Sequence, residues 1–243
     1  MSVRDPFRLF AGLLTIVLAA GCSPGSPETT TSTYSPPAQA VEMMLTTQDV
    51  PGATRVTWHE NLIQFTSCPG LEKLLVLSSS RSYDFSAITA EYSIGNSTVY
   101  ETAVLNVSTP SPSEHFEKFK NLITSCNGRQ SGAYHTVIST PFQVTENFTA
   151  TPAADLPDGL IGFTSLITAD DGTDERTIQR IYVPVITNSH EPGIIVLTTV
   201  SDTDYPGAPA PLDLLDAALR RADATVSSAA FFSPSPDSTT SPE

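Results

Sequence analysis

The N-terminal segment constrains this chain most, because it decides which residues remain to build a domain. Leu9 to Ala20 is a run of twelve almost purely apolar residues, and Arg4 and Arg8 precede it. A run of this length is typical of the hydrophobic region of a secretory signal and is too short to cross a bilayer as a helix. We therefore expect residues 1–21 to be a signal peptide and the mature chain to fold outside the cytoplasm.

Gly21 and Cys22 follow the apolar run directly, and a polar stretch begins after them. This arrangement resembles the lipobox of bacterial lipoproteins, although Ala19 stands where that family usually has Leu. The resemblance implies cleavage before Cys22, a lipidated Cys22 thiol with acyl chains such as palmitate, and attachment to the extracytoplasmic side of the cell membrane. An ordinary cleaved signal peptide with an incidental cysteine and an uncleaved anchor are the alternatives.

Both ends of the mature chain have the composition of unfolded segments. Residues 23–40 are rich in Pro, Ser and Thr, and residues 233–243 contain no aliphatic or aromatic side chain. We expect residues 22–40 to be the lipidated Cys and an extended tether, and residues 233–243 to be a disordered tail. The Thr-rich tether resembles the O-glycosylated tethers of actinobacterial lipoproteins. Residues 41–232 remain as one domain, which is large enough for a substantial core.

The charge of the chain excludes one class of partner. The sequence has 12 Lys and Arg against 26 Asp and Glu, and removal of residues 1–21 leaves 10 against 25. A mature protein with a net charge of about −15 repels phosphate backbones, so we expect no nucleic-acid partner. The same charge argues against electrostatic attraction to anionic lipid. We therefore expect the membrane to be a partner only through the lipid anchor.

The cysteine count predicts a disulfide. Once Cys22 is assigned to lipid, Cys68 and Cys126 remain. Two leftover cysteines in an oxidising compartment usually pair. Two buried free thiols are the alternative. We expect no metal site, because neither cysteine lies in a Cys-x-x-Cys motif or near a His at ligand spacing.

Alternating apolar residues predict an antiparallel sheet. One strand pair flanks a turn at residues 95–97, and three later strand segments are joined by short polar turns, which is a meander signature. In residues 99–107, Glu101 falls on the same face as Val99 and Ala103. Because Pro184 interrupts a strand, we expect an edge or a bulge there. The predicted strands are residues 55–65, 87–94, 99–108, 160–169, 176–187 and 193–201.

Two segments have helical periodicity. Ser111 fits an N-cap with Pro112 in the first turn, and apolar residues recur from there to Cys126. A second helix is expected from Leu212 to Phe231. The predicted fold class is therefore α+β, a single domain in which an antiparallel β-sheet has two long helices packed on one face.

The order of these segments resembles actinobacterial envelope lipoproteins related to the extracellular sensor domain of the PknH-type receptor kinase. The resemblance rests on the Leu-Thr-x-x-Asp-Val-Pro segment at Leu45–Pro51, on the helix that ends in Cys126, and on the closing Ala-rich helix, and it spans about residues 41–230. It implies an α+β sandwich with a concave sheet face and a sensing or ligand-binding role. That sensor domain usually has two disulfides, whereas this chain has cysteines for one.

No motif predicts catalysis. His59, His115, His135 and His190 form no zinc motif, and no nucleophile elbow, Ser-x-x-Lys, P-loop or dinucleotide fingerprint occurs. The acidic residues 170–175 do not have EF-hand spacing and are interpreted as a solvated hairpin tip. Trp58, the only Trp, is interpreted as a core residue rather than a ligand contact. We expect no enzyme activity and no cofactor.

These observations favour a membrane-anchored extracytoplasmic lipoprotein that acts as a ligand-binding or sensing module. Its partner would be a small molecule, a lipid or an envelope protein, and the sequence assigns no ligand-binding residue. The alternative is a carrier of a lipid or another hydrophobic molecule in the cell envelope, which requires a large apolar cavity. An enzyme of another type and a structural partner in an envelope complex are further alternatives.

Overall fold

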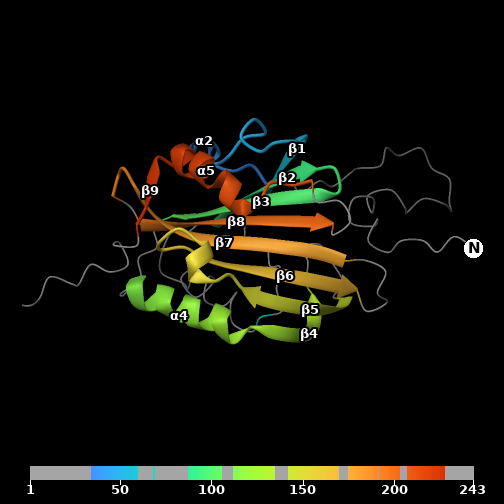
Figure 1. Cartoon of the computed structure of the whole chain (residues 1–243). Helices are drawn as coiled ribbons and strands as arrows, with labels where there is room; N and C mark the ends of the chain where they lie inside the picture. Colours follow the sequence, from blue (N-terminus) through green and yellow to red (C-terminus); the bar gives the residue numbers. More distant parts are fainter. Residues whose placement is uncertain are drawn as a thin grey trace, which may run out of the picture.

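The computed structural model describes residues 34–59, 68, 87–105, 112–134, 142–169, 175–190, 192–202 and 207–227. The predicted signal peptide, Cys22, most of the predicted tether and the predicted tail lie outside these residues. Eight strands form one antiparallel sheet in the order β1-β2-β3-β8-β7-β6-β5-β4, and β9 pairs with β7 (Figure 1). The strands are β1 Arg55–His59, β2 Ala87–Ile94, β3 Ser97–Leu105, β4 Gly128–Tyr134, β5 Phe142–Ala150, β6 Ile161–Ala169, β7 Glu175–Thr187, β8 Pro192–Asp202 and β9 Ala224–Val226.

The helical elements are few and mostly short. They are α2 Ala38–Met43, α4 Pro112–Ser125, α5 Leu215–Arg221, and the 3-10 turns η1 Ala153–Asp155 and η2 Pro211–Leu214. The helix predicted after Ser111 is confirmed as α4, which begins at Pro112. It is followed by Gly128 with φ 113°, a left-handed conformation that costs glycine little.

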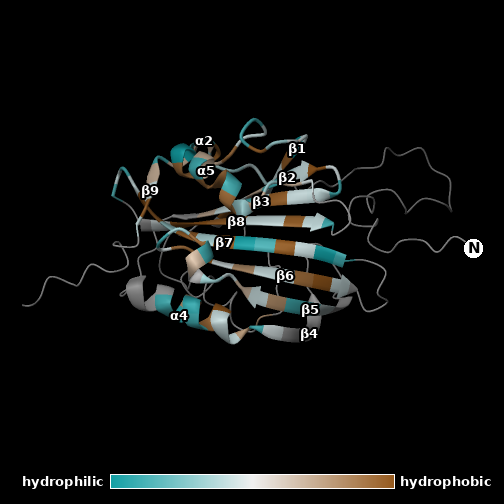
Figure 2. Ribbon diagram, in the orientation of Figure 1, coloured by the Kyte–Doolittle hydropathy of each residue, from teal (hydrophilic) through white to brown (hydrophobic). Residues whose placement is uncertain are grey.

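The sheet buries both of its faces. Successive side chains on a strand point to opposite faces, so β7 sends Tyr182 to one hydrophobic core and Ile181 to the other. The α4 face, as we name it, carries the core that contains Phe119 and Ile123 of α4. The α5 face carries the core that contains Leu215 of α5. The central strands β7 and β8 are accordingly buried over several consecutive residues, and brown and teal segments both occur along the strands in Figure 2.

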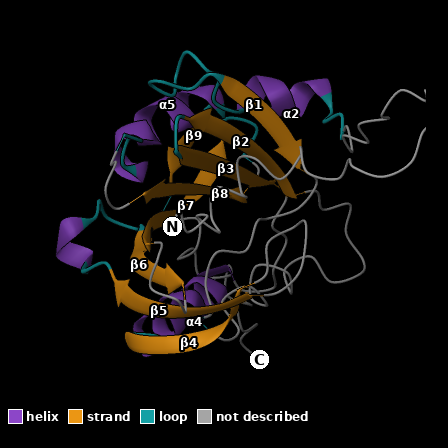
Figure 3. Ribbon diagram, turned by 90° about the vertical axis from the view of Figure 1, so that its right-hand side faces the viewer, coloured by secondary structure: helices purple, strands orange, loops and turns teal. Residues whose placement is uncertain are grey.

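The predicted fold class is wrong in its helices. The sheet is antiparallel, as expected, but α5 has only 7 residues against 14 in α4, so the described residues contain one long helix and not the expected pair. The two helices also pack into different cores on opposite faces. Figure 3 shows the sheet curving strongly, with α2 and α5 beside β1–β3 and α4 inside the curve near β4 and β5. Helical periodicity predicts that a face is buried, but it does not say against which face of a sheet.

The helix predicted from Leu212 to Phe231 ends early for a local reason and a tertiary one. Asp223 has φ 48°, a left-handed conformation that stops the helix after α5. The chain then continues as β9, in which Val226 pairs with Val185 of β7. Pairing with β7 thus overrides the helical spacing of the apolar residues. Residues 228–231 lie outside the described part of the chain.

Pro184 lies in a central strand rather than at an edge. It pairs with Ile194 of β8 on one side. On the other side, pairing of β7 with β6 ends at Tyr182 and pairing with β9 begins at Val185. The missing N–H of Pro184 thus falls near the change of partner strand, which explains why a proline is tolerated inside a long strand.

Candidate functional site

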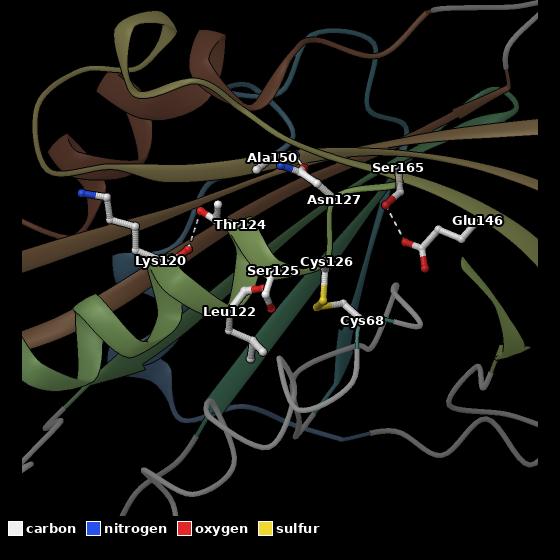
Figure 4. Close-up of a disulfide and its surroundings, with 10 residues drawn as sticks. All are labelled: Cys68, Lys120, Leu122, Thr124, Ser125, Cys126, Asn127, Glu146, Ala150 and Ser165. Carbon is white, nitrogen blue, oxygen red and sulfur yellow. Dashed lines mark hydrogen bonds between the residues drawn. A yellow bond between two sulfur atoms is a disulfide. The ribbon is translucent and has the colours of Figure 1, made fainter. Parts of the chain in front are cut away.

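One end of α4 is fixed by a covalent bond. Cys126, which follows α4, is bonded to Cys68 with a Cα–Cα distance of 5.7 Å, and both residues are buried in the α4-face core (Figure 4). The next residue, Asn127, accepts a hydrogen bond from the Ala150 N–H at 2.7 Å. The disulfide and the Asn127 contact together hold this end of the helix against β5.

A line of buried polar side chains crosses the strands on the α4 face of the sheet. Six adjacent strands, in the order β2-β3-β8-β7-β6-β5, each contribute one of them, and none is more than 2% exposed. The register places neighbouring members directly opposite or diagonally to one another on the same face. We call this set the polar row; its members are Thr89, Thr102, Thr198, Arg180, Ser165 and Glu146.

Hydrogen bonds join the polar row in three successive pairs. The hydroxyls of Thr89 and Thr102 lie 2.7 Å apart. The Arg180 Nε–H donates to the Thr198 hydroxyl at 2.8 Å. The Ser165 hydroxyl donates to Glu146 Oε1 at 2.5 Å, a short contact drawn in Figure 4. The row therefore places hydroxyl groups beside two side chains of opposite charge.

Arg180 is the central charge of the row. Its guanidinium carbon lies 5.9 Å from the ring centroids of both Phe163 and Tyr182. Phe163 also stacks on Phe148, with centroids 4.6 Å apart. Aromatic faces attract a cation, so these rings help to hold a charged side chain within an otherwise apolar core.

At the β1 side the polar row continues into a half-buried pair. His59 of β1 pairs in register with Thr89, and its Nε2 lies 2.8 Å from Glu91 Oε2. On β3, burial and then the Glu91 charge raise the pKa of Tyr100. This end of the α4 face therefore holds a carboxyl group beside an imidazole, whereas the centre holds the Arg180 guanidinium.

A second polar group lies on the α5 face. Glu101 of β3 is 1% exposed and accepts the Leu45 N–H at 2.7 Å. The Tyr92 hydroxyl lies 3.3 Å from the same Glu101 oxygen and donates to Leu45 O at 2.6 Å. Burial raises the pKa of Glu101 to about 8, while the hydrogen bonds from Leu45 and Tyr92 act in the opposite direction.

An ion pair between Arg221 and Asp49 lies on the same face and acts on the Glu101 carboxyl. Arg221 of α5 contacts Asp49 Oδ2 through Nε at 2.9 Å and through a terminal nitrogen at 2.8 Å. Thr46 donates to the same oxygen from its N–H at 3.0 Å and from its hydroxyl at 2.7 Å. Burial raises the pKa of Asp49, but Thr46 and Arg221 outweigh it and lower the pKa below its usual value. The Arg221–Asp49 contact therefore joins the first and last described parts of the domain.

The structure places several of the His, Asp and Trp residues that the sequence analysis discussed. Among the described residues, no group of three or more His, Cys, Asp or Glu side chains is placed to hold a metal ion. Trp58 is half-buried and packs against the α5-face core. His190 is exposed, Asp202 lies 4.0 Å from Arg176, and His135 and residues 170–174 lie outside the described part.

The polar row was missed at the sequence level. Its local signals are Arg180 within an apolar strand and Glu146 two residues before the buried Phe148. Neither signal identifies a site alone, because the row exists only after strands from both halves of the chain have paired.

No family model and no curated protein matches the sequence. Among solved structures, the fold is similar to the extracellular domain of PknH from Mycobacterium tuberculosis, with a TM-score of 0.46 and 9% identity over 78% of this chain and 96% of that one. Within the described part of the chain, no helix is long and apolar enough to span a bilayer.

Proposed function

We propose that this protein is a membrane-anchored extracytoplasmic lipoprotein that acts as a ligand-binding or sensing module, and that its ligand binds at the polar row. The apolar run before Cys22 supports the location, and the bond between Cys68 and Cys126 fits an oxidising compartment. The observation that carries the binding role is the alignment of six buried polar side chains on one sheet face.

Stability alone does not account for this row. Burial of an ionised side chain costs several kcal/mol, and well-packed apolar residues commonly serve as well or better. Arg180 and Glu146 are nevertheless both buried on the α4 face among Phe, Tyr and Ile side chains. Such an arrangement is better explained by recognition than by packing.

The chemistry of the row favours a ligand with an anionic group. The planar guanidinium of Arg180 matches the geometry of carboxylates and phosphates. Thr198 beside it, and the Thr89–Thr102 pair, offer hydroxyls that both donate and accept. The aromatic rings of Phe163 and Tyr182 can cover an apolar part of the same ligand.

Because the polar row is buried, binding of a ligand there requires a conformational change of the domain. Because its members are at most 2% exposed, a ligand reaches them only after part of the domain has moved away. A ligand that binds such an opened state shifts the population toward it. This coupling of binding to a conformational change is what a sensing module requires.

Binding is tested by titrating the protein with inorganic phosphate, acetate and dispersed phosphatidylglycerol while NMR shifts of β6–β8 are followed. Saturable shifts with one of these probes, lost in Arg180→Gln and weakened in Thr198→Val, are expected. Arg176→Gln is the matched control, because Arg176 lies on the same strand outside the row, where it contacts Asn96 O at 3.0 Å. Phosphatidylglycerol as the sole binding probe would support the carrier alternative. No saturable shift with any probe, or equal loss in the Arg176 variant, would overturn the proposed site.

The anchor is tested by intact-mass spectrometry of protein extracted from its membrane. The expected mass is that of a chain beginning at Cys22, increased by acyl groups and reduced by two hydrogens for the disulfide. A soluble chain without acyl mass would contradict the membrane attachment and leave Cys22 as a thiol.

A further inference from the structure

The α5 face holds the first described part of the domain by very few polar contacts. Residues 44–50, which we call the leading segment, bury Met44, Leu45 and Val50 in the α5-face core. The backbone of Leu45 is bound at both its N–H and its C=O by side chains of the sheet, Glu101 and Tyr92. This segment connects the domain to the residues that precede it, so these contacts fix where the domain begins.

Proton positions in this group are restricted by the geometry. Tyr92 Oη has one proton, and two oxygens lie near it: Leu45 O at 2.6 Å and Glu101 Oε2 at 3.3 Å. The shorter contact uses the Tyr92 proton, because two oxygens without a proton between them repel at that distance. A second proton, supplied by a neutral Glu101 carboxyl, is then needed for the Glu101–Tyr92 contact.

With neutral Glu101, three donors and three acceptors close a ring. Leu45 N–H donates to Glu101, the Glu101 O–H donates to Tyr92, and the Tyr92 O–H donates to Leu45 O. With ionised Glu101, the Tyr92 proton can satisfy either Leu45 O or the carboxylate, but not both. If the Tyr92 proton stays on Leu45 O, the carboxylate keeps only the Leu45 N–H as a donor, and its charge lies 1% exposed with one hydrogen bond; if the proton moves to the carboxylate, Leu45 O loses its donor.

We propose that Glu101, Tyr92 and the Leu45 backbone form a proton-dependent latch, which is closed while Glu101 is protonated and opens when Glu101 ionises, releasing the leading segment from the α5 face. The latch does not depend on the polar row, which lies on the opposite face of the sheet. It concerns how the domain is joined to the preceding chain, so it goes beyond ligand binding.

The charged groups around Glu101 agree with this behaviour. Ala90 of β2 and Leu197 of β8 flank it in register and carry no charge. The groups that act on Glu101 are Tyr92 of β2, Asp49 of the leading segment and Arg221 of α5. Burial raises the pKa of Glu101 to about 8; the Asp49 charge also raises it, whereas the Arg221 charge lowers it. Opening is therefore expected as the pH rises from neutral to mildly alkaline.

The Arg221–Asp49 pair limits how far the released segment can move. Asp49 has a lowered pKa and stays ionised throughout this range. The segment would then be held by Arg221 at one end while the Leu45 end is free. The expected movement is local and starts at the end of the segment nearest α2.

The test follows amide hydrogen exchange of Leu45 in the full-length protein by NMR between about pH 6 and pH 9, after correction for intrinsic exchange. The protection factor of wild type should fall roughly tenfold over this range. Glu101→Gln, whose amide oxygen can still accept the Leu45 N–H and whose side chain does not titrate, should show a constant factor. Glu146→Gln is the matched control, because it removes a buried carboxyl on the opposite face, and it should fall as wild type does.

A measurement on wild type alone guards against a variant that fails to fold. The ¹³C shift of the Glu101 carboxyl should titrate near the raised value and together with the Leu45 protection factor. Titration at the ordinary value of 4.5, or parallel loss of protection in wild type and Glu101→Gln, would overturn the latch.

Discussion

Replacing Glu101 with Gln should make the protein more stable than wild type as the pH rises. A carboxyl whose pKa is raised on folding contributes stability that is present below its unfolded pKa and is lost as the pH rises through its folded pKa. For Glu101 these values are 4.5 and about 8. Each pKa unit corresponds to about 1.4 kcal/mol, so the full effect approaches about 5 kcal/mol.

About half of this effect falls in a pH range that is easily measured. Between about pH 5 and pH 7, linkage predicts that wild type loses roughly 2–3 kcal/mol relative to Glu101→Gln. Urea unfolding measures the difference, with Trp58 as the fluorescence reporter, since it is the only Trp and packs against the α5-face core. The difference between the free energies of unfolding of the two proteins cancels the contribution of every other group that titrates alike in both. A difference that stays flat over this range would refute the reasoning.

Three further substitutions test the contacts that hold the domain. Cys126→Ser removes the bond to Cys68, which spans 58 residues of sequence, and should cost about 4 kcal/mol in the chain-entropy model; the urea midpoint should then no longer respond to reductant. Arg221→Met removes the contacts to Asp49 and should cost only about 1 kcal/mol, because the Arg221 side chain is 35% exposed; the difference from wild type should shrink at high salt. Phe163→Ala empties a position that is 1% exposed and should cost about 3–5 kcal/mol in thermal unfolding, and a loss below about 1 kcal/mol would contradict the assignment of this ring to the core.

Sequence patterns predicted well those strands that pair with their neighbours in sequence. Strand β2 has the predicted bounds, because alternation within residues 87–94 and the turn at Gly95 act together. The meander of β6, β7 and β8 was also recovered. These elements pair with neighbours in sequence, so turn chemistry and alternation contain most of the information.

The elements that were missed depend on distant partners. Strand β4, with the sequence GRQSGAY, has almost no apolar pattern and is defined by its pairing with β5. Apolar and polar residues do alternate in strand β5, but Glu146 occupies a buried position where the pattern requires an apolar residue. The early end of the last helix likewise requires knowledge that β7 is free to pair with β9.

The candidate sites show the same division. Glu101 could be noticed in the sequence, because it shares a strand face with Val99 and Ala103. Its partner Leu45 could not, since 56 residues separate the two. The Cys68–Cys126 pair follows from counting, whereas alignment of Arg180 with Thr198 needs the register of β7 and β8.

The pairing of β3 with β8 has a consequence for how the chain folds. These strands are adjacent in the sheet but far apart in sequence, with Leu105 opposite Gly193. Strands β1–β3 therefore present an open backbone edge on β3 until β8 has been synthesised and has paired with it. Such an edge can pair with another chain, and long-range pairing of this kind slows folding. Completing the sheet and avoiding aggregation are thus linked through the single strand β8.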